Sequence, residues 1–137
     1  MGLILDSSIV IDSERRGDTV VQLLRKVVSV TGDQKVALSS VGLTELTHAT
    51  YRAKLPSVQL RHEYFLQSLL AELDVVPYTK NTALLAGRID GEQRTLGIAI
   101  PSMDLLIGAT ALEIGYSILT VNLRHFRLIP GLTVLTL

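Results

Sequence analysis

Four polar residues of this sequence have types and positions from which a reactive site could be built: Asp6, Glu45, Asp104 and Asn122. Asp6 directly follows the apolar run Leu3–Leu5, and Asn122 follows another apolar run near the C-terminus. All four side chains offer oxygen ligands, and oxygen ligands select a hard cation such as Mg²⁺ or Mn²⁺. An ion of this kind, held by acids at strand ends, typically acts on phosphate esters.

Each of these residues also has an ordinary structural explanation when it is taken alone. Asp6 could cap a helix, and Asp104 could be favoured near a helix N-terminus by the helix dipole. Glu45 could be a solvated helix residue and Asn122 a turn residue. Their combination favours a site, because Asp104 is the only acid between Leu96 and Leu112, in a helix that is apolar on nearly every face and should be buried. Acids brought together raise one another's pKa unless a cation neutralises them.

The elements that must position these residues alternate between short apolar strands and helices. Strands are expected at Leu3–Leu5, Val36–Leu38, Val75–Val76, Ile118–Thr120 and Leu132–Leu135. Helices are expected at Ser7–Ile11, Thr19–Val30, Val41–Ala53, Val58–Glu72, from a cap at Thr79 to Thr95, and at Met103–Ile114. This alternation predicts an α/β fold, a three-layer α/β/α sandwich with a central parallel sheet of four to five strands. In such sheets, functional groups collect beyond the carboxyl ends of the strands.

Local patterns add finer expectations about the helices. Ser39–Ser40 can cap the helix that carries Glu45, and Ser102 can cap the helix that carries Asp104. In the helix before it, Leu84, Leu85 and Ile89 are expected to face inward.

Length and composition exclude several classes of protein. The 137 residues fit one domain, 1–137, and the absence of Cys removes disulfides, thiol catalysis and zinc fingers. Lys and Arg together number 13 and so do Asp and Glu, a balance that taken alone argues against a nucleic-acid partner. An acid precedes any signal-peptide core, and no stretch is suited to span a membrane. A cytoplasmic protein without membrane contact is therefore expected.

Other enzyme classes lack their motifs in this sequence. His48, His62 and His125 show no HExxH or HxxxH spacing, and no P-loop, GxGxxG or GxSxG motif is present. Phosphatases of the haloacid-dehalogenase type need a second acid two residues after the first, but Ser8 stands there after Asp6. Receiver domains need an Asp at a strand end in the middle of the chain, and that is also missing.

Four segments occur in an order and at a spacing that are typical of one family. They are Leu3–Asp12, Leu38–Leu46, Ile98–Ala111 and Leu119–Phe126, the last followed by Ile129–Leu132. Together they resemble the PIN-domain ribonucleases, and among these the VapC toxins of bacterial toxin–antitoxin pairs. The resemblance covers the whole chain and implies a PIN-like fold and a metal-dependent endoribonuclease that hydrolyses RNA phosphodiesters. It also implies a homodimer and a VapB-like antitoxin that holds the toxin inactive.

The same resemblance assigns roles to individual residues. It implies that three catalytic carboxylates hold Mg²⁺ or Mn²⁺: Asp6, Glu45 and Asp104. Asn122 is a catalytic candidate too, since it stands where the family often has a fourth acid, but an amide oxygen adds no negative charge. The number of metal ions is therefore left open. Ser8 and Thr120 match positions that usually support the site by hydrogen bonding, whereas Asp12 is interpreted as an ordinary helix residue.

Contacts to the RNA are harder to assign. One face of the second-motif helix carries Glu45, His48 and Arg52. If Glu45 faces the metal, His48 and Arg52 are expected to lie along the same groove. Arg15 and Arg124 also lie near strand ends, and an arginine can donate two hydrogen bonds to a phosphate. An ordinary surface role remains the alternative for each of these residues.

His125 has two interpretations. It could assist a leaving group, but a structural histidine next to a buried Phe126 is the interpretation that the sequence favours. With only two Phe and four Tyr in the chain, no platform for stacking bases is visible.

Two alternatives to a toxin remain open at this stage. One is a free-standing PIN-domain RNA-processing nuclease, and the other is a degenerate PIN module that binds without cleaving. Asn122 favours degeneracy, whereas the three intact carboxylates argue against it. If there is an antitoxin, the apolar region Val58–Leu73 is a candidate for its binding surface.

Overall fold

A five-stranded parallel sheet forms the centre of the molecule. The computed structural model describes all 137 residues, with strands β1 (Gly2–Leu5), β2 (Lys35–Ser39), β3 (Asp74–Val76), β4 (Ser117–Leu119) and β5 (Val134–Leu135). Their order across the sheet is β3-β2-β1-β4-β5, and every neighbouring pair is parallel. All four residues of the central strand β1 are buried, which explains why it is a continuous apolar run in the sequence.

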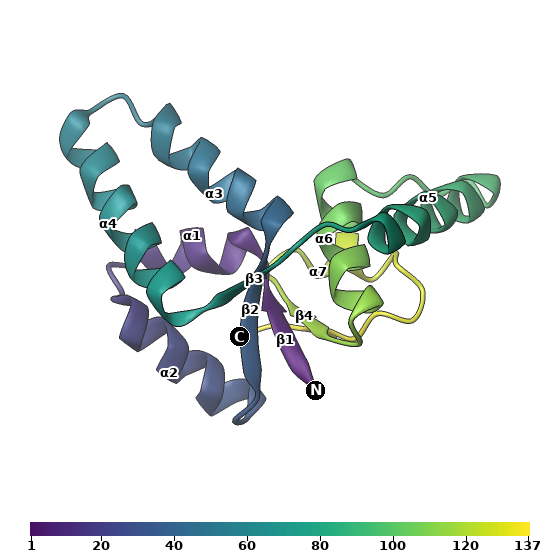
Figure 1. The fold of residues 1–137 in the computed structure, drawn as a ribbon, viewed down its shortest axis with the longest axis horizontal. Coiled ribbons are helices and arrows are strands. Elements are labelled where there is room, and N and C mark those ends of the chain that lie inside the picture. Colours follow the sequence, from purple (N-terminus) through teal and green to yellow (C-terminus); the bar gives the residue numbers. More distant parts are fainter.

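Seven helices surround this sheet: α1 (Ser7–Arg15), α2 (Val20–Thr31), α3 (Ser40–Arg52), α4 (Pro56–Glu72), α5 (Lys80–Thr95), α6 (Ser102–Glu113) and α7 (Leu123–Phe126). Figure 1 shows α1, α2 and α4 on one side of the sheet and α5, α6 and α7 on the other. Side chains of β1 alternate between two separate cores, with Leu3 and Leu5 in one and Ile4 in the other. The predicted three-layer α/β/α sandwich is confirmed. No helix is both long and apolar enough to cross a membrane.

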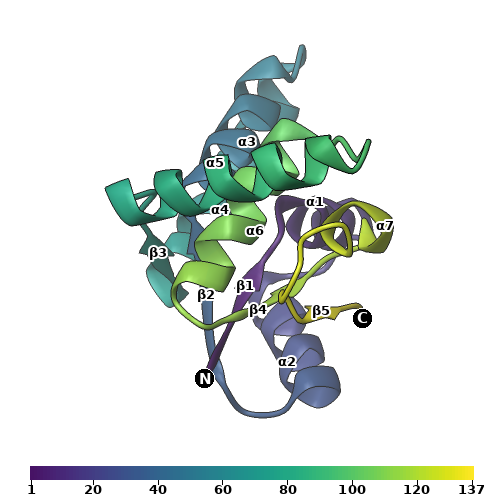
Figure 2. The same ribbon diagram turned by 90° about the vertical axis from the view of Figure 1, so that its right-hand side faces the viewer.

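Helix α3 leaves the sheet at the end of β2 and forms a hairpin with α4. The hairpin projects from the body of the molecule (Figures 1 and 2). Four large apolar side chains of this hairpin are more than half exposed: Tyr51, Leu55, Leu60 and Tyr64. The base of α3 contacts both α1 and α6, so this helix connects the two sides of the sheet.

The helix starts follow the polar caps of the sequence closely. Thr79 forms the predicted cap of α5, and its side chain accepts a hydrogen bond from the backbone of Thr82. Ser39 caps α3, accepting from the backbone of Gly42 at 2.9 Å. Other bounds differ by a few residues: α1 continues to Arg15, and the last strand begins at Val134 instead of Leu132.

Two local predictions are wrong. Ser102 does not cap α6, because Pro101 occupies the cap position without a side-chain hydrogen bond and Ser102 is already the first helical residue. Proline fixes its own φ, here −53°, so the chain enters the helix directly after it. Leu84 is 66% exposed, because the inward face of α5 runs through Thr82 and Ile89.

Candidate functional site

Asp6 is the most enclosed of the three predicted carboxylate ligands and is 1% exposed. It follows the last residue of β1, and its backbone N–H donates to the carbonyl of Leu119 in β4 at 2.9 Å. Its carboxylate oxygen Oδ2 accepts hydrogen bonds from Ser8 Oγ at 2.5 Å and from Thr120 Oγ1 at 2.8 Å. The backbone N–H of Asn122 donates to Thr120 Oγ1 at 2.9 Å. The ends of β1 and β4 are therefore joined through this carboxylate.

Glu45 reaches the same region from α3. The hydroxyl of Ser7, the first residue of α1, donates to Glu45 Oε1 at 2.7 Å. Burial raises the pKa of Glu45 above its ordinary value, and the hydrogen bond from Ser7 opposes this effect. The charges of Asp6 and Asp104 raise the pKa of Glu45 further. All three acids thus interact electrostatically.

Asp104 lies in the first turn of α6 and contacts a histidine from another element. Its oxygen Oδ2 is 2.7 Å from Nδ1 of His125 in α7, and the exposed fraction of the Asp104 side chain is 13%. Burial raises the pKa of Asp104, the hydrogen bond to His125 lowers it, and the charge of Asp6 raises it. A carboxylate in this environment is stabilised in its ionised form by a nearby cation.

The three acids come from three segments that meet at the carboxyl ends of the central strands. Asp6 follows β1, Glu45 lies in the helix after β2, and Asp104 lies in α6, which precedes β4. This is the edge where parallel α/β sheets form their functional crevice. In the present side-chain arrangement, no group of three His, Asp or Glu residues is gathered closely enough to hold a metal ion.

Asn122 and Arg124 lie at the edge of this region. Asn122 is exposed at the start of α7, and no side-chain hydrogen bond from it caps that helix. Arg124 is likewise exposed in α7. The amide of Asn122 is therefore free to interact with a ligand, and Arg124 is placed on the same short helix.

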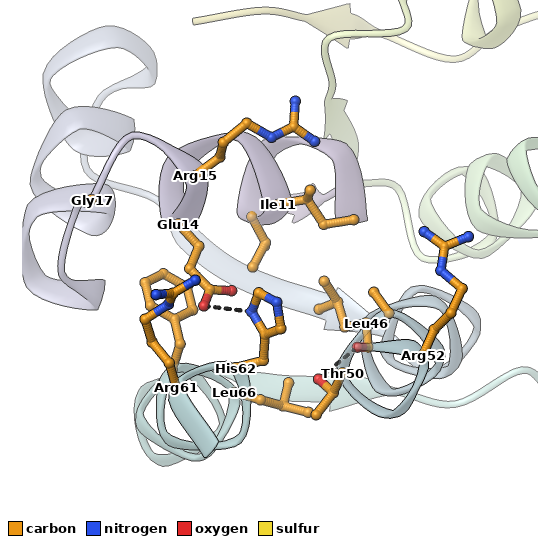
Figure 3. Close-up of a pocket in the computed structure, with 13 residues that line it drawn as sticks. Ile11, Glu14, Arg15, Gly17, Leu46, Thr50, Arg52, Arg61, His62 and Leu66 are labelled. Atoms are coloured by element: carbon orange, nitrogen blue, oxygen red, sulfur yellow. Dashed lines mark hydrogen bonds and ion pairs between the residues drawn. The ribbon is translucent and has the colours of Figure 1, made fainter. Parts of the chain in front are cut away.

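The other proposed RNA contacts fall into two different hollows. Arg15 and Arg52 line a pocket of about 510 Å³ between α1, α3 and α4, and none of the three acids lines it. Figure 3 shows these arginines together with Arg61, each from a different helix, around an apolar floor that includes Ile11. His48 instead lines a shallow hollow along α3. His48 and Arg52 thus line different hollows, although both lie on α3.

Two residues of the site were not predicted from the sequence. Ser7 contacts Glu45 across 38 residues, and His125 contacts Asp104 across 21. The sequence offers only a weak signal for each: Ser7 directly follows a predicted ligand, and His125 lies three residues after Asn122. The interpretation of His125 as a purely structural residue overlooked this contact.

Comparison with known proteins adds independent findings. The family profile described as "PIN domain" matches residues 3–132. The chain is 32% identical over 136 residues to Ribonuclease VapC1 of Rickettsia felis, covering 99% of this chain and 96% of the relative. It is also 27% identical over 100 residues to the tRNA(fMet)-specific endonuclease VapC of Salmonella typhimurium, covering 73% of this chain and 74% of that one.

The fold has close counterparts among solved structures. A chain in the crystal structure of VapBC2 from Rickettsia felis bound to a promoter DNA fragment superimposes with a TM-score of 0.85. The match covers 100% of this chain and 99% of that chain at 20% sequence identity, so it supports the fold. Fold and sequence together define a PIN domain. Within the PIN-domain family, the chain belongs to the VapC ribonucleases, the toxins of VapBC toxin–antitoxin systems.

Proposed function

We propose that this VapC-type ribonuclease hydrolyses RNA phosphodiesters with a divalent cation, Mg²⁺ or Mn²⁺, held by Asp6, Glu45 and Asp104. The observation that carries the proposal is the convergence of three acids, each of which receives a hydrogen bond on one oxygen. A cytoplasmic location is part of the proposal, since cellular RNA is the substrate.

The donor set fits a hard cation. It consists of carboxylate oxygens with an exposed amide oxygen nearby, and it contains no thiolate. One oxygen of each acid accepts no side-chain or backbone hydrogen bond: Asp6 Oδ1, Glu45 Oε2 and Asp104 Oδ1. These are the atoms available as ligands. A bound ion supplies Lewis-acid stabilisation of charge on the phosphate and lowers the pKa of a coordinated water.

The residues around the acids have distinct tasks in this proposal. Ser8 and Thr120 hold Asp6 in place, while Asn122 offers an amide to the ion or the scissile phosphate. Arg15, Arg52 and Arg124 are exposed and can bind phosphates along the RNA. His48 lines a separate hollow along α3 and can contact another part of the substrate there.

The test is cleavage of total RNA by the purified full-length protein, with the cut sites mapped. We expect cleavage with Mn²⁺, none with EDTA, and none by Asp6→Asn with Mn²⁺ present. Asp12→Asn is the matched control, because Asp12, in the helix α1 that follows Asp6, makes an exposed ion pair with Arg16 at 2.6 Å. Cleavage by Asp6→Asn at the wild-type rate would contradict the assignment of the site.

The same assay separates the alternatives. A degenerate binding module would retain RNA without cutting it under any metal condition. Purified tRNA is a useful separate substrate, since one relative is named as an endonuclease specific for a tRNA.

We place the antitoxin in the pocket between α1, α3 and α4. Its apolar floor includes Phe65 and Leu66, which belong to the predicted surface Val58–Leu73, and exposed Arg52 and Arg61 surround it. An amphipathic segment with acidic side chains fits this combination. Charge reversal in Arg61→Glu should weaken antitoxin binding in a titration, whereas Arg25→Glu on the outer surface of α2 should not.

We also propose a homodimer, and its support is the set of exposed apolar side chains on the α3–α4 hairpin. Leu55 is 62% exposed and Tyr64 is 78% exposed. Apolar side chains gathered in this way are typical of an interaction surface. Sedimentation of the wild-type protein should give the mass of a dimer, and Leu55→Arg should shift it towards the 14.9 kDa monomer.

A further inference from the structure

The contact between Asp104 and His125 joins two elements that are distant in the sequence. His125 belongs to α7, a helix of four residues, and Asp104 lies in α6, 21 residues earlier. The His125 Nδ1 atom is 2.7 Å from Asp104 Oδ2. We propose that His125 is a positioning residue, which holds the Asp104 carboxylate so that Oδ1 remains free to bind the cation.

The direction of the hydrogen bond follows from the chemistry of the two groups. An ionised carboxylate can only accept, so Nδ1 carries the proton and donates it to Oδ2. Because Oδ2 is engaged in this way, rotation of the carboxylate costs a hydrogen bond to a charged acceptor. Burial alone favours the protonated form of Asp104, and the hydrogen bond to His125 favours the ionised form that a cation needs.

The packing of α7 against α6 explains why His125 is reliably placed. Gly108 lies one turn after Asp104 on the same face of α6. A Cβ atom built on Gly108 would be 2.2 Å from Ile129 Cδ1 and 3.4 Å from Phe126 Cδ1. The chain around α7 therefore lies directly on this glycine, and Phe126, fully buried, anchors the residue next to His125. A well-packed segment therefore holds the His125 imidazole next to Asp104.

Asp104, like Glu45, has a single hydrogen-bond partner. Asp6 accepts from two hydroxyls, and Glu45 accepts from the hydroxyl of Ser7. Asp104 has His125 as its only side-chain hydrogen-bond partner. Asn122 stands on the same turn as His125 and adds no charge of its own. The orientation of Asp104 thus depends on one donor.

The inference rests on the proposed metal site, so its test measures Mn²⁺ binding directly by calorimetry on the full-length protein. His125→Ala should weaken Mn²⁺ binding by about 10- to 100-fold, the usual effect of losing an outer partner of a metal ligand. His125→Asn places an amide nitrogen where Nδ1 lies and should restore most of the affinity. His125→Gln carries its amide one bond further out, near the place of Nε2, and should not restore it.

A matched control exists elsewhere in the chain. His62 Nδ1 lies 2.7 Å from Glu14 Oε2, so this pair joins two helices through the same kind of contact, away from the acids (Figure 3). His62→Ala should leave the Mn²⁺ dissociation constant unchanged. Circular dichroism and Tm show whether each variant is folded. If His125→Ala unfolds, the comparison between His125→Asn and His125→Gln still decides the question.

The outcomes distinguish this inference from the proposed function. Wild-type affinity in His125→Ala, together with lost binding in Asp104→Asn, overturns the positioning role and leaves the metal site intact. Equal losses in His125→Asn and His125→Gln also overturn it, since the Nδ1 donor would then be irrelevant. A wild-type protein that binds no Mn²⁺ overturns the metal site itself and this inference with it.

Discussion

At the scale of single residues, the site is built from acids and their individual hydrogen-bond donors. Hydroxyl donors hold Asp6 and Glu45, and an imidazole holds Asp104. Each donor leaves one carboxylate oxygen free. Donors that are themselves fixed by secondary structure restrict the rotamers of the acids, which reduces the entropy lost when a ligand binds.

The acids could be found from the sequence because each belongs to a local pattern. Asp6 ends an apolar run, and Asp104 is the one acid in an otherwise apolar helix. Ser7 and His125 could not be found in the same way, because their partners lie 38 and 21 residues away. Such contacts depend on how elements pack, and a single sequence does not encode them as a local pattern.

Replacing Asn122 by Asp should tighten Mn²⁺ binding. The residue is exposed beside the acids, and a fourth negative charge there attracts the cation. An effect on the order of tenfold, about 1.4 kcal/mol, is expected at low ionic strength. Calorimetry at two salt concentrations measures it, and the gain should shrink as salt increases.

The control for this substitution is Asn81→Asp, because Asn81 is exposed in the first turn of α5 and lies outside the site. It should leave Mn²⁺ affinity unchanged. An unchanged dissociation constant in Asn122→Asp would mean that residue 122 does not face the ion.

At the scale of elements, the important contact is the one between α6 and the segment around α7. Gly108 allows this contact, since the Ile129 side chain fills the space that a side chain at residue 108 would need. Both segments were expected from the sequence, but their register against each other was not. The glycine is an ordinary helix residue in the sequence, and only the packed structure shows why a larger residue would not fit.

Gly108→Ala should destabilise the fold and also weaken Mn²⁺ binding. The added Cβ would lie 2.2 Å from Cδ1 of the buried Ile129, so this side chain must shift, and we expect the displacement to reach His125 in α7. Overpacking of this kind costs about 1–3 kcal/mol. Chemical denaturation measures the loss of stability, and calorimetry measures the loss of metal affinity.

Gly87→Ala in α5 provides the comparison. A Cβ atom there meets nothing within 4 Å, and the residue is helical. Alanine has the higher helix propensity, so this variant should gain up to about 1 kcal/mol with unchanged Mn²⁺ affinity. If Gly108→Ala behaved like Gly87→Ala, the packing argument for α7 would be wrong.

At the scale of the whole molecule, an overall charge of zero hides an uneven distribution. Three acids are concentrated at one edge of the sheet, and exposed arginines lie around the neighbouring pocket. The balance of 13 basic and 13 acidic residues therefore says little about RNA binding, because a bound cation changes the local charge of the site. The stability of the metal-free molecule should also depend on the protonation of these clustered acids.

The metal-free protein should become less stable as pH rises through the raised pKa values of Glu45 and Asp104. Their pKa values lie above the ordinary ones, so the folded state holds these protons more tightly than the unfolded state does. The resulting contribution to stability is complete below the ordinary pKa and is lost above the raised one. Tm measured in EDTA should therefore decrease more for wild type than for Glu45→Gln as pH rises from the ordinary pKa to the raised one.

With excess Mn²⁺, stability should no longer decrease as pH rises, because the ion neutralises the deprotonated carboxylates. At about 100 times the dissociation constant, a ligand that binds only the folded state adds about 2.7 kcal/mol. Metal affinity should itself rise with pH, because protons compete for the same oxygens. Glu113→Gln, an exposed substitution at the end of α6, serves as the control and should follow the wild-type curve. Parallel curves for wild type and Glu45→Gln, with and without Mn²⁺, would show that Glu45 does not take part in the acid cluster.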